Sequence, residues 1–176
     1  MPNDPFVDVA ALSSLGPIRY LDARDRATFD AGHTPGAVRV PVDEWDAAAK
    51  AADVGFNKTA YWNHALGSLG VDPSAIAVTY DGGQMTNAAR VWFILQYFGV
   101  KAVILNGGWP ALSEAAGLPA GAGPAKGPFH AVPGAGSVLT RPPQFRDREG
   151  SSRYSVVAPL AVPRNWRPTD WPPSRY

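Results

Sequence analysis

The stretch AIAVTYDGGQMTNAARVWFILQYF, residues 75–98, contains the features that decide the fold. Its first part, residues 75–80, is almost continuously apolar, as is typical of a parallel strand buried on both faces. A polar loop with two glycines follows at 81–86, and residues 87–98 predict a strongly apolar helix that ends at Gly99. This order predicts that backbone N–H groups of the loop and of the helix N-terminus converge on whatever occupies the loop.

The same alternation of strands and helices extends to both sides of this stretch. The pattern predicts strands at 18–22, 37–42 and 101–105, and helices at 26–31, 43–52, 59–69 and 109–116. Asp43 is the expected N-cap of the second of these helices. Strands that alternate with helices predict βαβ units, and hence an α/β fold with a mostly parallel central sheet flanked by helices on both faces. In such sheets ligands bind at the carboxyl ends of strands, where the loop at 81–86 lies.

The composition is that of an ordinary globular protein, with 45% hydrophobic residues and a net charge of +1. So small a charge predicts neither a nucleic-acid nor a membrane partner. The sequence contains no cysteine, which excludes disulfides, thiolate metal sites and a cysteine nucleophile within it. His64 and His130 have no neighbours at metal-ligand spacing, so we expect no metal and no cofactor. No apolar run approaches the roughly 18 residues of a membrane span, and no signal-peptide pattern is seen, so we expect a cytoplasmic protein.

The end of the chain differs in composition from the rest. Residues 141–176 contain seven arginines, no lysine, three acidic residues and seven prolines. Before them, residues 117–140 are rich in glycine, alanine and proline, which predicts an extended or flexible linker. We therefore expect a domain over 1–133 with its core at about 8–120, followed by a tail at 141–176 that is irregular or disordered.

Three stretches, in order and correctly spaced, resemble the rhodanese/Cdc25 family of sulfurtransferases. The first is LDAR at 21–24, followed by Phe29 and the turn GHTPGA at 32–37, with His33, Pro35 and Gly36. The second is the loop 81–86 with ARVW at 89–92. The third is LNGGW at 105–109, with Gly107, Gly108 and Trp109, followed by AGLP at 116–119. The resemblance covers residues 8–133 and implies a rhodanese-like domain.

Within the family, ARVW and the aromatic helix around it resemble the first domain of tandem two-domain enzymes. Those enzymes transfer sulfur from thiosulfate or 3-mercaptopyruvate, and their second domain carries the nucleophilic cysteine. The resemblance implies that this domain packs, through its cleft face, against a second rhodanese domain or another protein. The altered composition after residue 140 suggests a truncated or frame-shifted product, a hypothesis that the nucleotide sequence downstream of codon 140 would test.

Asp81 aligns with the first position of the family's active-site loop, where sulfur transfer needs a thiolate. The resemblance assigns Asp81, Gly82, Gly83, Gln84, Met85 and Thr86 to that anion-binding loop. A carboxylate is an anion that can accept the same N–H groups, but it has no sulfur with which to form a persulfide. Two interpretations stay open and can coexist: Asp81 fills an anion cradle, or it is a turn or N-cap acid after a strand.

The other candidate residues have structural and functional interpretations as well. In active members an arginine at the place of Arg24 helps to bind the anionic donor, whereas here a salt bridge or packing role for Asp22 and Arg24 is favoured. Arg90 could point toward an anion, but pairing with Asp22 or Asp81 is favoured. For His33 we expect a turn hydrogen bond. Tryptophans 62, 92 and 109 are expected to be core residues.

Three functions are compatible with the sequence. The first is a non-catalytic half of a thiosulfate or 3-mercaptopyruvate sulfurtransferase, inactive alone. The second is a binding or regulatory module that docks a partner through the cleft face. The third, which ranks lowest because the sequence places no general acid beside it, is an enzyme that uses Asp81 as nucleophile or base. A domain that evolved packed against another should also expose an apolar face and self-associate.

Overall fold

The computed structural model describes residues 5–51, 55–71, 74–121 and 128–136. The chain divides into two units, residues 1–140 and 141–176, and all described residues belong to the first. The tail expected at 141–176 therefore lies outside the described residues. Among the described residues, no helix has the length and apolar character that a membrane span requires. The cytoplasmic location stays a prediction.

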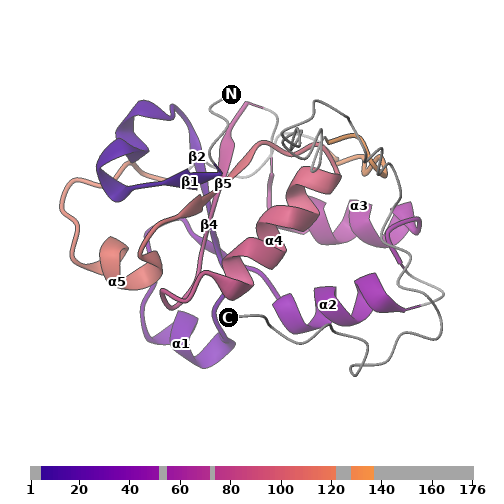
Figure 1. The fold of residues 1–176 in the computed structure, drawn as a ribbon, viewed down its shortest axis with the longest axis horizontal. Coiled ribbons are helices and arrows are strands. Elements are labelled where there is room, and N and C mark those ends of the chain that lie inside the picture. The colour runs from indigo at the N-terminus through magenta and orange to yellow at the C-terminus, as the bar shows by residue number, and fades with distance from the viewer. Residues whose placement is uncertain (1–4, 52–54, 72–73, 122–127, 137–176) are drawn as a thin grey trace, which may run out of the picture. The chain divides into compact units, whose positions relative to one another are not determined.

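A five-stranded sheet forms the centre of the domain (Figure 1). Its strands are β1 (Phe6–Val7), β2 (Ile18–Asp22), β3 (Val38–Arg39), β4 (Ile76–Tyr80) and β5 (Ala102–Leu105). They lie in the order β1-β5-β4-β2-β3, and every neighbouring pair is parallel. Asp22 at the end of β2 is in register with Tyr80 at the end of β4. The carboxyl ends of the adjacent strands β2 and β4 therefore lie side by side at the same edge of the sheet.

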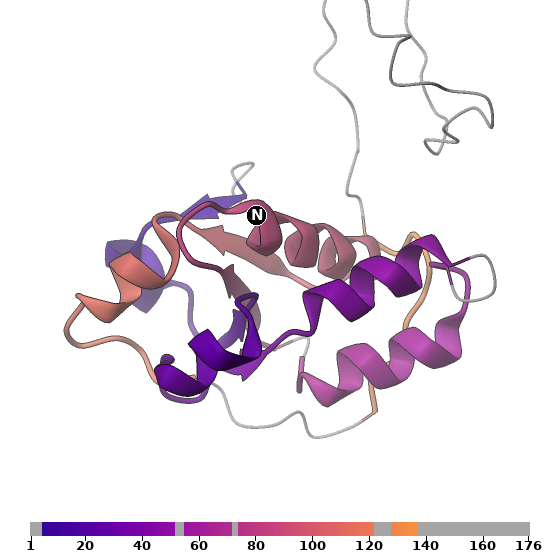
Figure 2. The ribbon, with the colours of Figure 1, turned by 90° about the horizontal axis from the view of Figure 1, so that it is seen from below.

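Helices cover both faces of this sheet, as the alternation in the sequence predicts. They are the 3-10 helix η1 (Val9–Ser14) and the α-helices α1 (Arg26–Ala31), α2 (Val42–Lys50), α3 (Thr59–Ser68), α4 (Thr86–Tyr97) and α5 (Gly108–Ser113). In Figure 1, α5 and α3 lie to either side of the strands, and Figure 2 shows α2 and α3 side by side.

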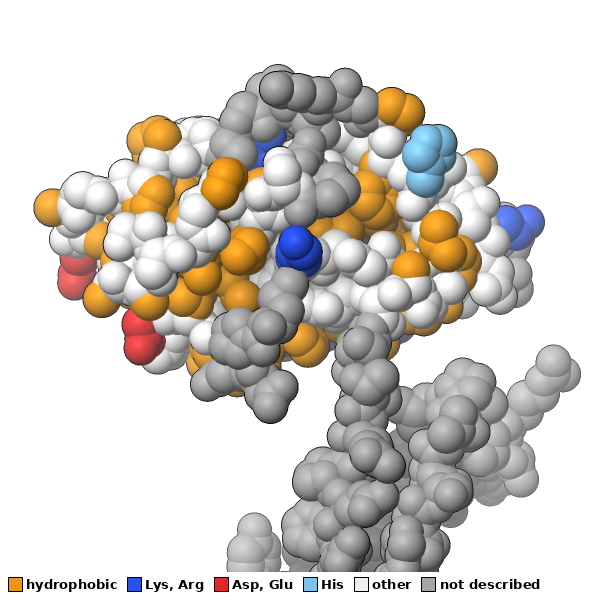
Figure 3. All heavy atoms as spheres, turned by 90° about the horizontal axis from the view of Figure 1, so that it is seen from above, with side chains coloured by type: hydrophobic (Ala, Val, Ile, Leu, Met, Phe, Trp, Pro, Cys, Tyr) orange, Lys and Arg blue, Asp and Glu red, His pale blue; other side chains and the backbone are white. Residues whose placement is uncertain are grey.

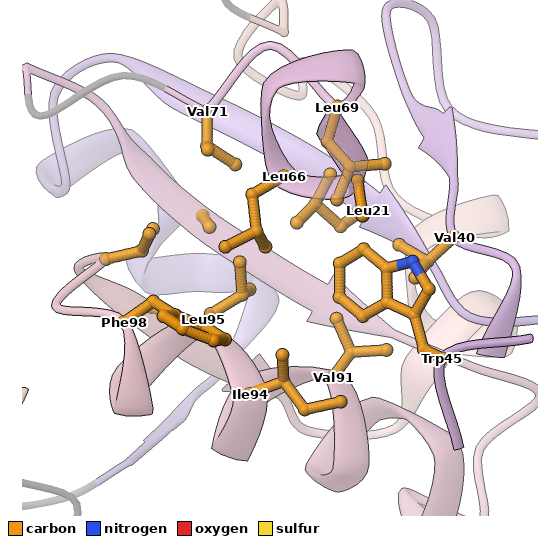
Figure 4. Close-up of a cluster of buried hydrophobic side chains, with 14 of the residues drawn as sticks. Leu21, Val40, Trp45, Leu66, Leu69, Val71, Val91, Ile94, Leu95 and Phe98 are labelled. Carbon is orange, nitrogen blue, oxygen red and sulfur yellow. The ribbon is translucent and has the colours of Figure 1, made fainter. Parts of the chain in front are cut away.

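The buried side chains form one hydrophobic cluster on each face of the sheet. The larger cluster joins Leu21 and Ala77 of the sheet to α2, α3 and α4. Figure 4 shows part of it, with Trp45 of α2 reaching toward Val91 of α4. The smaller cluster joins Tyr20, Val78 and Tyr80 to η1 and α5. Neighbouring strand residues thus point to opposite faces, and burial on both faces explains the continuous apolar pattern of β4.

Most predicted elements are present, and the differences lie at their ends. The strand expected at 37–42 contains only β3, because Pro41 has no N–H to donate to a ladder. The prediction of Asp43 as N-cap is wrong: Pro41 takes that position, α2 begins at Val42, and Asp43 lies in the first helical turn. The helix expected at 109–116 already ends at Ser113. The sequence pattern missed β1 and η1, because each is too short to show a period.

The described parts of the stretch 117–140 are attached to the domain. Gly121 forms a parallel bridge with Ile18, and the Tyr20 hydroxyl donates to the Pro119 carbonyl at 3.2 Å. Further on, Ala131 is buried in the larger cluster, and its N–H donates to Asn63 Oδ1 at 2.5 Å. Over residues 117–121 and 128–136 this stretch therefore runs along the domain without helix or strand.

Candidate functional site

The carboxylate of Asp81 lies at the end of β4 inside a ring of backbone N–H groups. Oδ1 accepts from the N–H groups of Gly83 and Met85, both at 2.9 Å. Oδ2 accepts from those of Asn87 at 3.0 Å and Ala88 at 3.2 Å. We call these four donors, with the carboxylate they surround, the cradle. Asp81 is only 5% exposed, so the cradle rather than solvent satisfies both of its oxygens.

The backbone of the loop explains why these donors converge. Gly83 has φ of +106° and Met85 has φ of +60°, the one positive φ of a non-glycine residue among those described. The left-handed turn at Met85 leads directly into α4, which begins at Thr86. The first N–H groups of a helix have no partner within it, so those of Asn87 and Ala88 are free to bind Asp81. The positive end of the helix dipole favours an anion in the same place.

The glycines before Trp109 allow a second backbone segment to support the loop from behind. A Cβ on Gly108 would come within 2.5 Å of the Asp81 carbonyl oxygen and 2.7 Å of the Gly83 nitrogen, and Gly108 has φ of +57°. The next residue, Trp109, donates its N–H to that same carbonyl oxygen at 2.7 Å. Two motifs that are distant in sequence thus form one structural unit at the site.

A second buried carboxylate, Asp22 at the end of β2, pairs with Arg24. Arg24 Nε lies 3.0 and 3.1 Å from the two carboxylate oxygens, and Nη2 lies 2.6 Å from Oδ2. The guanidinium also donates to the Gly32 carbonyl at 2.7 Å, and its Cζ lies 4.4 Å from the centroid of the Trp109 ring and 5.9 Å from that of the Tyr80 ring. Burial opposes the charge of Arg24, but the hydrogen bond and the attraction of Asp22 outweigh it, so its pKa is raised. This geometry is the predicted salt bridge.

Tyr80 separates the two carboxylates, since it ends β4 in register with Asp22 and directly precedes Asp81. Its side chain is fully buried and packs near Trp109. Burial, followed by the negative charge of Asp22, raises the pKa of Tyr80 well above its usual range. The hydroxyl is therefore neutral at ordinary pH and supplies no charge to the site.

A polar cavity of about 410 Å³ opens beside the cradle. It is lined by Ala23, Arg24, Asp25, Thr28, Asp81, Gly82, Gln84, Thr86 and Asn87. Asp25 caps α1 through the N–H of Thr28, and its hydrogen bond with the Thr28 hydroxyl lowers its pKa. With Arg24 neutralised by Asp22, the remaining charged groups of the lining are the carboxylates of Asp25 and Asp81. Such a cavity offers hydrogen-bonding groups but no free positive charge.

The predicted loop residues divide into donors and cavity-lining residues. Gly83 and Met85 donate to Asp81, whereas Gly82, Gln84 and Thr86 line the cavity. The donors Asn87 and Ala88 were not predicted from the sequence, and neither were Asp25 and Thr28 of the cavity. Two sequence signals could have identified these residues. For Asp25 and Thr28, the signal is an acid three residues before a threonine at a helix start. For Asn87 and Ala88, it is their place among the first N–H groups of the helix that follows the loop.

The predicted pairing of Arg90 with Asp22 or Asp81 is wrong. Its Nη1 donates to Asn87 Oδ1 at 3.1 Å, and none of the ion pairs among the described residues includes Arg90. Asp22 is paired with Arg24 instead, and the hydrogen bonds to Asp81 come from backbone N–H groups.

The turn at 32–37 supports the site from outside the cavity. His33 is exposed, its Nδ1 lies 3.0 Å from the Phe29 carbonyl oxygen, and its ring stacks on Phe29 with centroids 4.0 Å apart. Pro35 and Gly36 are exposed, and Gly36, with φ of +79°, passes close to Gly121. The described residues contain no group of three histidine or acidic side chains that could hold a metal ion.

Comparison with known proteins gives a consistent result. The model of the rhodanese-like domain family matches residues 7–115. The chain is 32% identical to the thiosulfate sulfurtransferase of Cricetulus griseus over 108 residues, 54% of this chain and 36% of that protein. It is 31% identical to the 3-mercaptopyruvate sulfurtransferase of Rattus norvegicus over 105 residues, 53% of this chain and 35% of that protein. The chain thus matches about a third of the length of these curated relatives.

A solved structure agrees with these matches. The crystal structure of SseA from Escherichia coli, described as having the rhodanese fold of 3-mercaptopyruvate sulfotransferases, superposes with a TM-score of 0.51 at 27% identity. The superposition covers 74% of this chain and 56% of SseA. With the parallel five-stranded sheet and a family model that matches more than half of its length, the chain belongs to the rhodanese-like domain family.

Proposed function

We propose that this chain is a non-catalytic rhodanese-like domain of the thiosulfate or 3-mercaptopyruvate sulfurtransferase type, inactive in sulfur transfer on its own. In this proposal Asp81 occupies the position of the nucleophile. The observation that carries it is the cradle, in which four N–H groups bind both oxygens of one buried carboxylate. The chain itself provides the anion that an active domain would hold as a thiolate or persulfide.

The chemistry of the first loop position supports inactivity. A persulfide forms when a thiolate attacks the outer sulfur of a donor, so the attacking atom must be sulfur. Asp81 has none, and the sequence contains no cysteine that could replace it. The carboxylate is also poorly placed as a nucleophile, because each of its oxygens already accepts two hydrogen bonds.

The charge around the cavity supports the same proposal. An anionic sulfur donor needs a cation that is free to meet it. Here Arg24 is held by Asp22, by a backbone carbonyl and by the Trp109 ring. The carboxylates of Asp25 and Asp81 would repel a donor such as thiosulfate from the same cavity. The proposed role is therefore structural support of a partner, a second rhodanese domain or another protein, that packs on the cavity side.

An enzyme that uses Asp81 as general base is less well supported. Asp25 is the second carboxylate that such chemistry needs, and it lines the cavity. However, the hydrogen bond from Thr28 lowers the pKa of Asp25, which keeps it ionised and unable to donate a proton near neutral pH. A binding module that docks a partner without any role in sulfur transfer stays the alternative.

The experiment that tests the proposal places a sulfur atom in the cradle. The purified chain, Asp81→Cys and Gln84→Cys are incubated with thiosulfate or 3-mercaptopyruvate, and persulfide is measured by mass spectrometry and thiocyanate formation from cyanide. We expect no product from the unchanged chain and slow persulfide formation on Asp81→Cys, because the cradle lowers the pKa of a thiol placed there, whereas Arg24 stays bound to Asp22 and offers the donor no free cation. Gln84→Cys is the matched control, since Gln84 is an exposed residue of the same loop outside the cradle. Turnover by the unchanged chain would refute the proposal.

A further inference from the structure

A hydrogen bond between distant parts of the chain joins the end of β5 to the start of η1. Asn106 directly follows β5, and its Nδ2 donates to Asp8 Oδ1 at 2.9 Å. Asp8 is at the N-cap position of η1, but its side chain makes no capping hydrogen bond there. The Asn106 N–H also donates to the Val7 carbonyl at 2.9 Å, which continues the pairing of β1 with β5. The side chain of Asn106 therefore holds β1 and η1 to the edge of the sheet.

Asn106 also has the features of a reactive amide. It is the one asparagine in the sequence that precedes a glycine. Asn106 is exposed, and the N–H of Gly107 makes no hydrogen bond among the described residues. Glycine has no Cβ to obstruct the approach of its nitrogen to the side chain of the preceding residue. An accessible side-chain carbonyl carbon and an unbonded backbone N–H are thus neighbours in the chain.

We propose that Asn106 is a site of spontaneous deamidation and isomerisation. The Gly107 nitrogen attacks Cγ of Asn106 and gives its proton to solvent, and Nδ2 takes up a proton and leaves as ammonia. Water then opens the five-membered imide. Cleavage of the bond from the Gly107 nitrogen to Cγ gives aspartate, and cleavage of its bond to the Asn106 carbonyl carbon gives isoaspartate. The reaction needs only water.

Both products replace the amide that binds Asp8 by a carboxylate. Asp8 is exposed and takes part in none of the ion pairs among the described residues. A second carboxylate there repels the first instead of donating to it. On the face in Figure 3 charged side chains are few, and the acidic ones lie on the side on which Figure 1 shows η1 and α5. We therefore expect the reaction to weaken the attachment of η1 to β5.

Isoaspartate has a second effect, because it lengthens the main chain by one carbon atom. The added atom directly precedes the turn at Gly107 and Gly108, where the backbone is closely packed. A Cβ on Gly108 would already lie 2.5 Å from the Asp81 carbonyl oxygen. The Trp109 N–H donates to that same oxygen at 2.7 Å. Isoaspartate at position 106 should therefore disturb the loop that forms the cradle, whereas aspartate should not.

Asp81 also precedes a glycine, but the structure protects it from the same reaction. Its carboxylate is buried, and each oxygen accepts two backbone hydrogen bonds. An ionised carboxylate held in this way is a poor target for a nucleophile. The inference for Asn106 is independent of the proposed function, since it involves neither sulfur chemistry nor a partner.

Peptide mapping of the full chain tests this inference. The chain is kept for several days at mildly alkaline pH and digested with trypsin, and a digest of the fresh chain gives the starting values. The peptide 102–126 contains one asparagine, Asn106, and no glutamine, so a gain of one mass unit identifies the reaction. The peptide 51–58 is the internal control, because its one asparagine, Asn57, is exposed and precedes a lysine.

Deamidation should be at least about ten times faster at Asn106 than at Asn57, since only Gly107 offers an unobstructed nitrogen. Fragment ions of the peptide 102–126 distinguish aspartate from isoaspartate, and both should be present. Equal rates at the two asparagines, or an unchanged mass of the peptide 102–126, would overturn the inference.

The consequence for the fold is tested by urea unfolding. Asn106→Asp should lower the midpoint, and Asp8→Asn in the same chain should restore it. Added salt should also reduce the loss, because exposed charges are screened. Asn57→Asp is the matched control, since it places the same charge at another exposed asparagine and should leave the midpoint unchanged. The isoaspartate form, separated by ion exchange, should unfold at a lower urea concentration than Asn106→Asp. If Asn106→Asp were as stable as the unchanged chain, or the isoaspartate form as stable as Asn106→Asp, the corresponding effect would be refuted.

Discussion

Two buried carboxylates end adjacent strands of the same sheet, and the protein balances them in different ways. Asp22, after β2, is neutralised by the guanidinium of Arg24, with a shortest contact of 2.6 Å. Asp81, after β4, is bound by four backbone N–H groups and by no cation among its hydrogen-bond partners. The charge of Asp22 is balanced by a cation, whereas that of Asp81 is balanced by the dipoles of backbone N–H groups.

This difference predicts which of the two carboxylates another negative group can replace. When one partner of a buried ion pair is removed, the charge of the other partner is left unmatched. A cradle of N–H groups is specific for an anion but not for a particular anion, so another negative group can take its place. The Asp22 pair is therefore a structural element, whereas the Asp81 cradle is an anion site in which a side chain happens to be the ligand. The following predictions test this distinction.

The largest effect is expected when Arg24 is removed. Arg24→Met leaves the carboxylate of Asp22, which is fully buried, without its cation. We expect the free energy of unfolding to fall by about 3–5 kcal/mol, measured by urea unfolding at neutral pH. The double variant Asp22→Asn/Arg24→Met should be more stable than Arg24→Met alone, because no unpaired charge stays buried. An Arg24→Met variant as stable as the unchanged chain would show that the pair is not structural.

A smaller effect is expected when the ligand of the cradle is removed. Asp81→Ala leaves four N–H groups without a carboxylate and should lower the free energy of unfolding by about 2–3 kcal/mol. Because the groups face a cavity, a small anion should replace the lost side chain. Formate at about five times its Kd should restore about 1 kcal/mol. The same formate should not stabilise Arg24→Met, and equal stabilisation of both variants would contradict the comparison.

The third prediction concerns the phenol of Tyr80 between the two carboxylates, whose pKa is raised by burial and then by the charge of Asp22. The folded pKa of Tyr80 is raised, so the unfolded chain loses this proton first. Stability from this group is complete below pH about 10 and falls by up to about 1.4 kcal/mol per pH unit above it. Tyr80→Phe removes this contribution, so its stability should decline less steeply than that of the unchanged chain. Urea unfolding at several pH values above 10 measures both slopes, and equal slopes would contradict the prediction.

The sequence was sufficient to predict the helices and strands that are long or buried on both faces. β4 and α4 begin and end within one residue of their predicted bounds, because a continuous apolar strand followed by a loop and an apolar helix has few other interpretations. The sequence could not predict β1. Its two residues become a strand only through pairing with β5, which is far away along the chain. Such an element is defined by tertiary contacts rather than by its own pattern.

The site was predictable in its composition but not in its contacts. The loop after β4 and the acid at its first position could be identified, because their place follows from the order of strand, loop and helix. Which N–H groups reach Asp81 depends on the positive φ of Met85, a conformation that methionine rarely adopts. The error at Arg90 has a similar origin. Its distance from the loop in sequence is short, but its direction is set by the rotation of α4.

The smallest effect is expected at a third carboxylate, Asp25, which also binds the N–H of a helix start but is exposed. Asp25→Ala should reduce stability at neutral pH by less than about half of the effect of Asp81→Ala, because water can replace an exposed cap. The folded pKa of Asp25 is lowered, so its contribution is present above the unfolded pKa and is lost as the pH falls through the folded one. The unfolding free energies of Asp25→Ala and of the unchanged chain should therefore converge as the pH falls below the folded pKa of Asp25. If Asp25→Ala instead cost as much as Asp81→Ala, burial would not be what distinguishes the cradle from an ordinary helix cap.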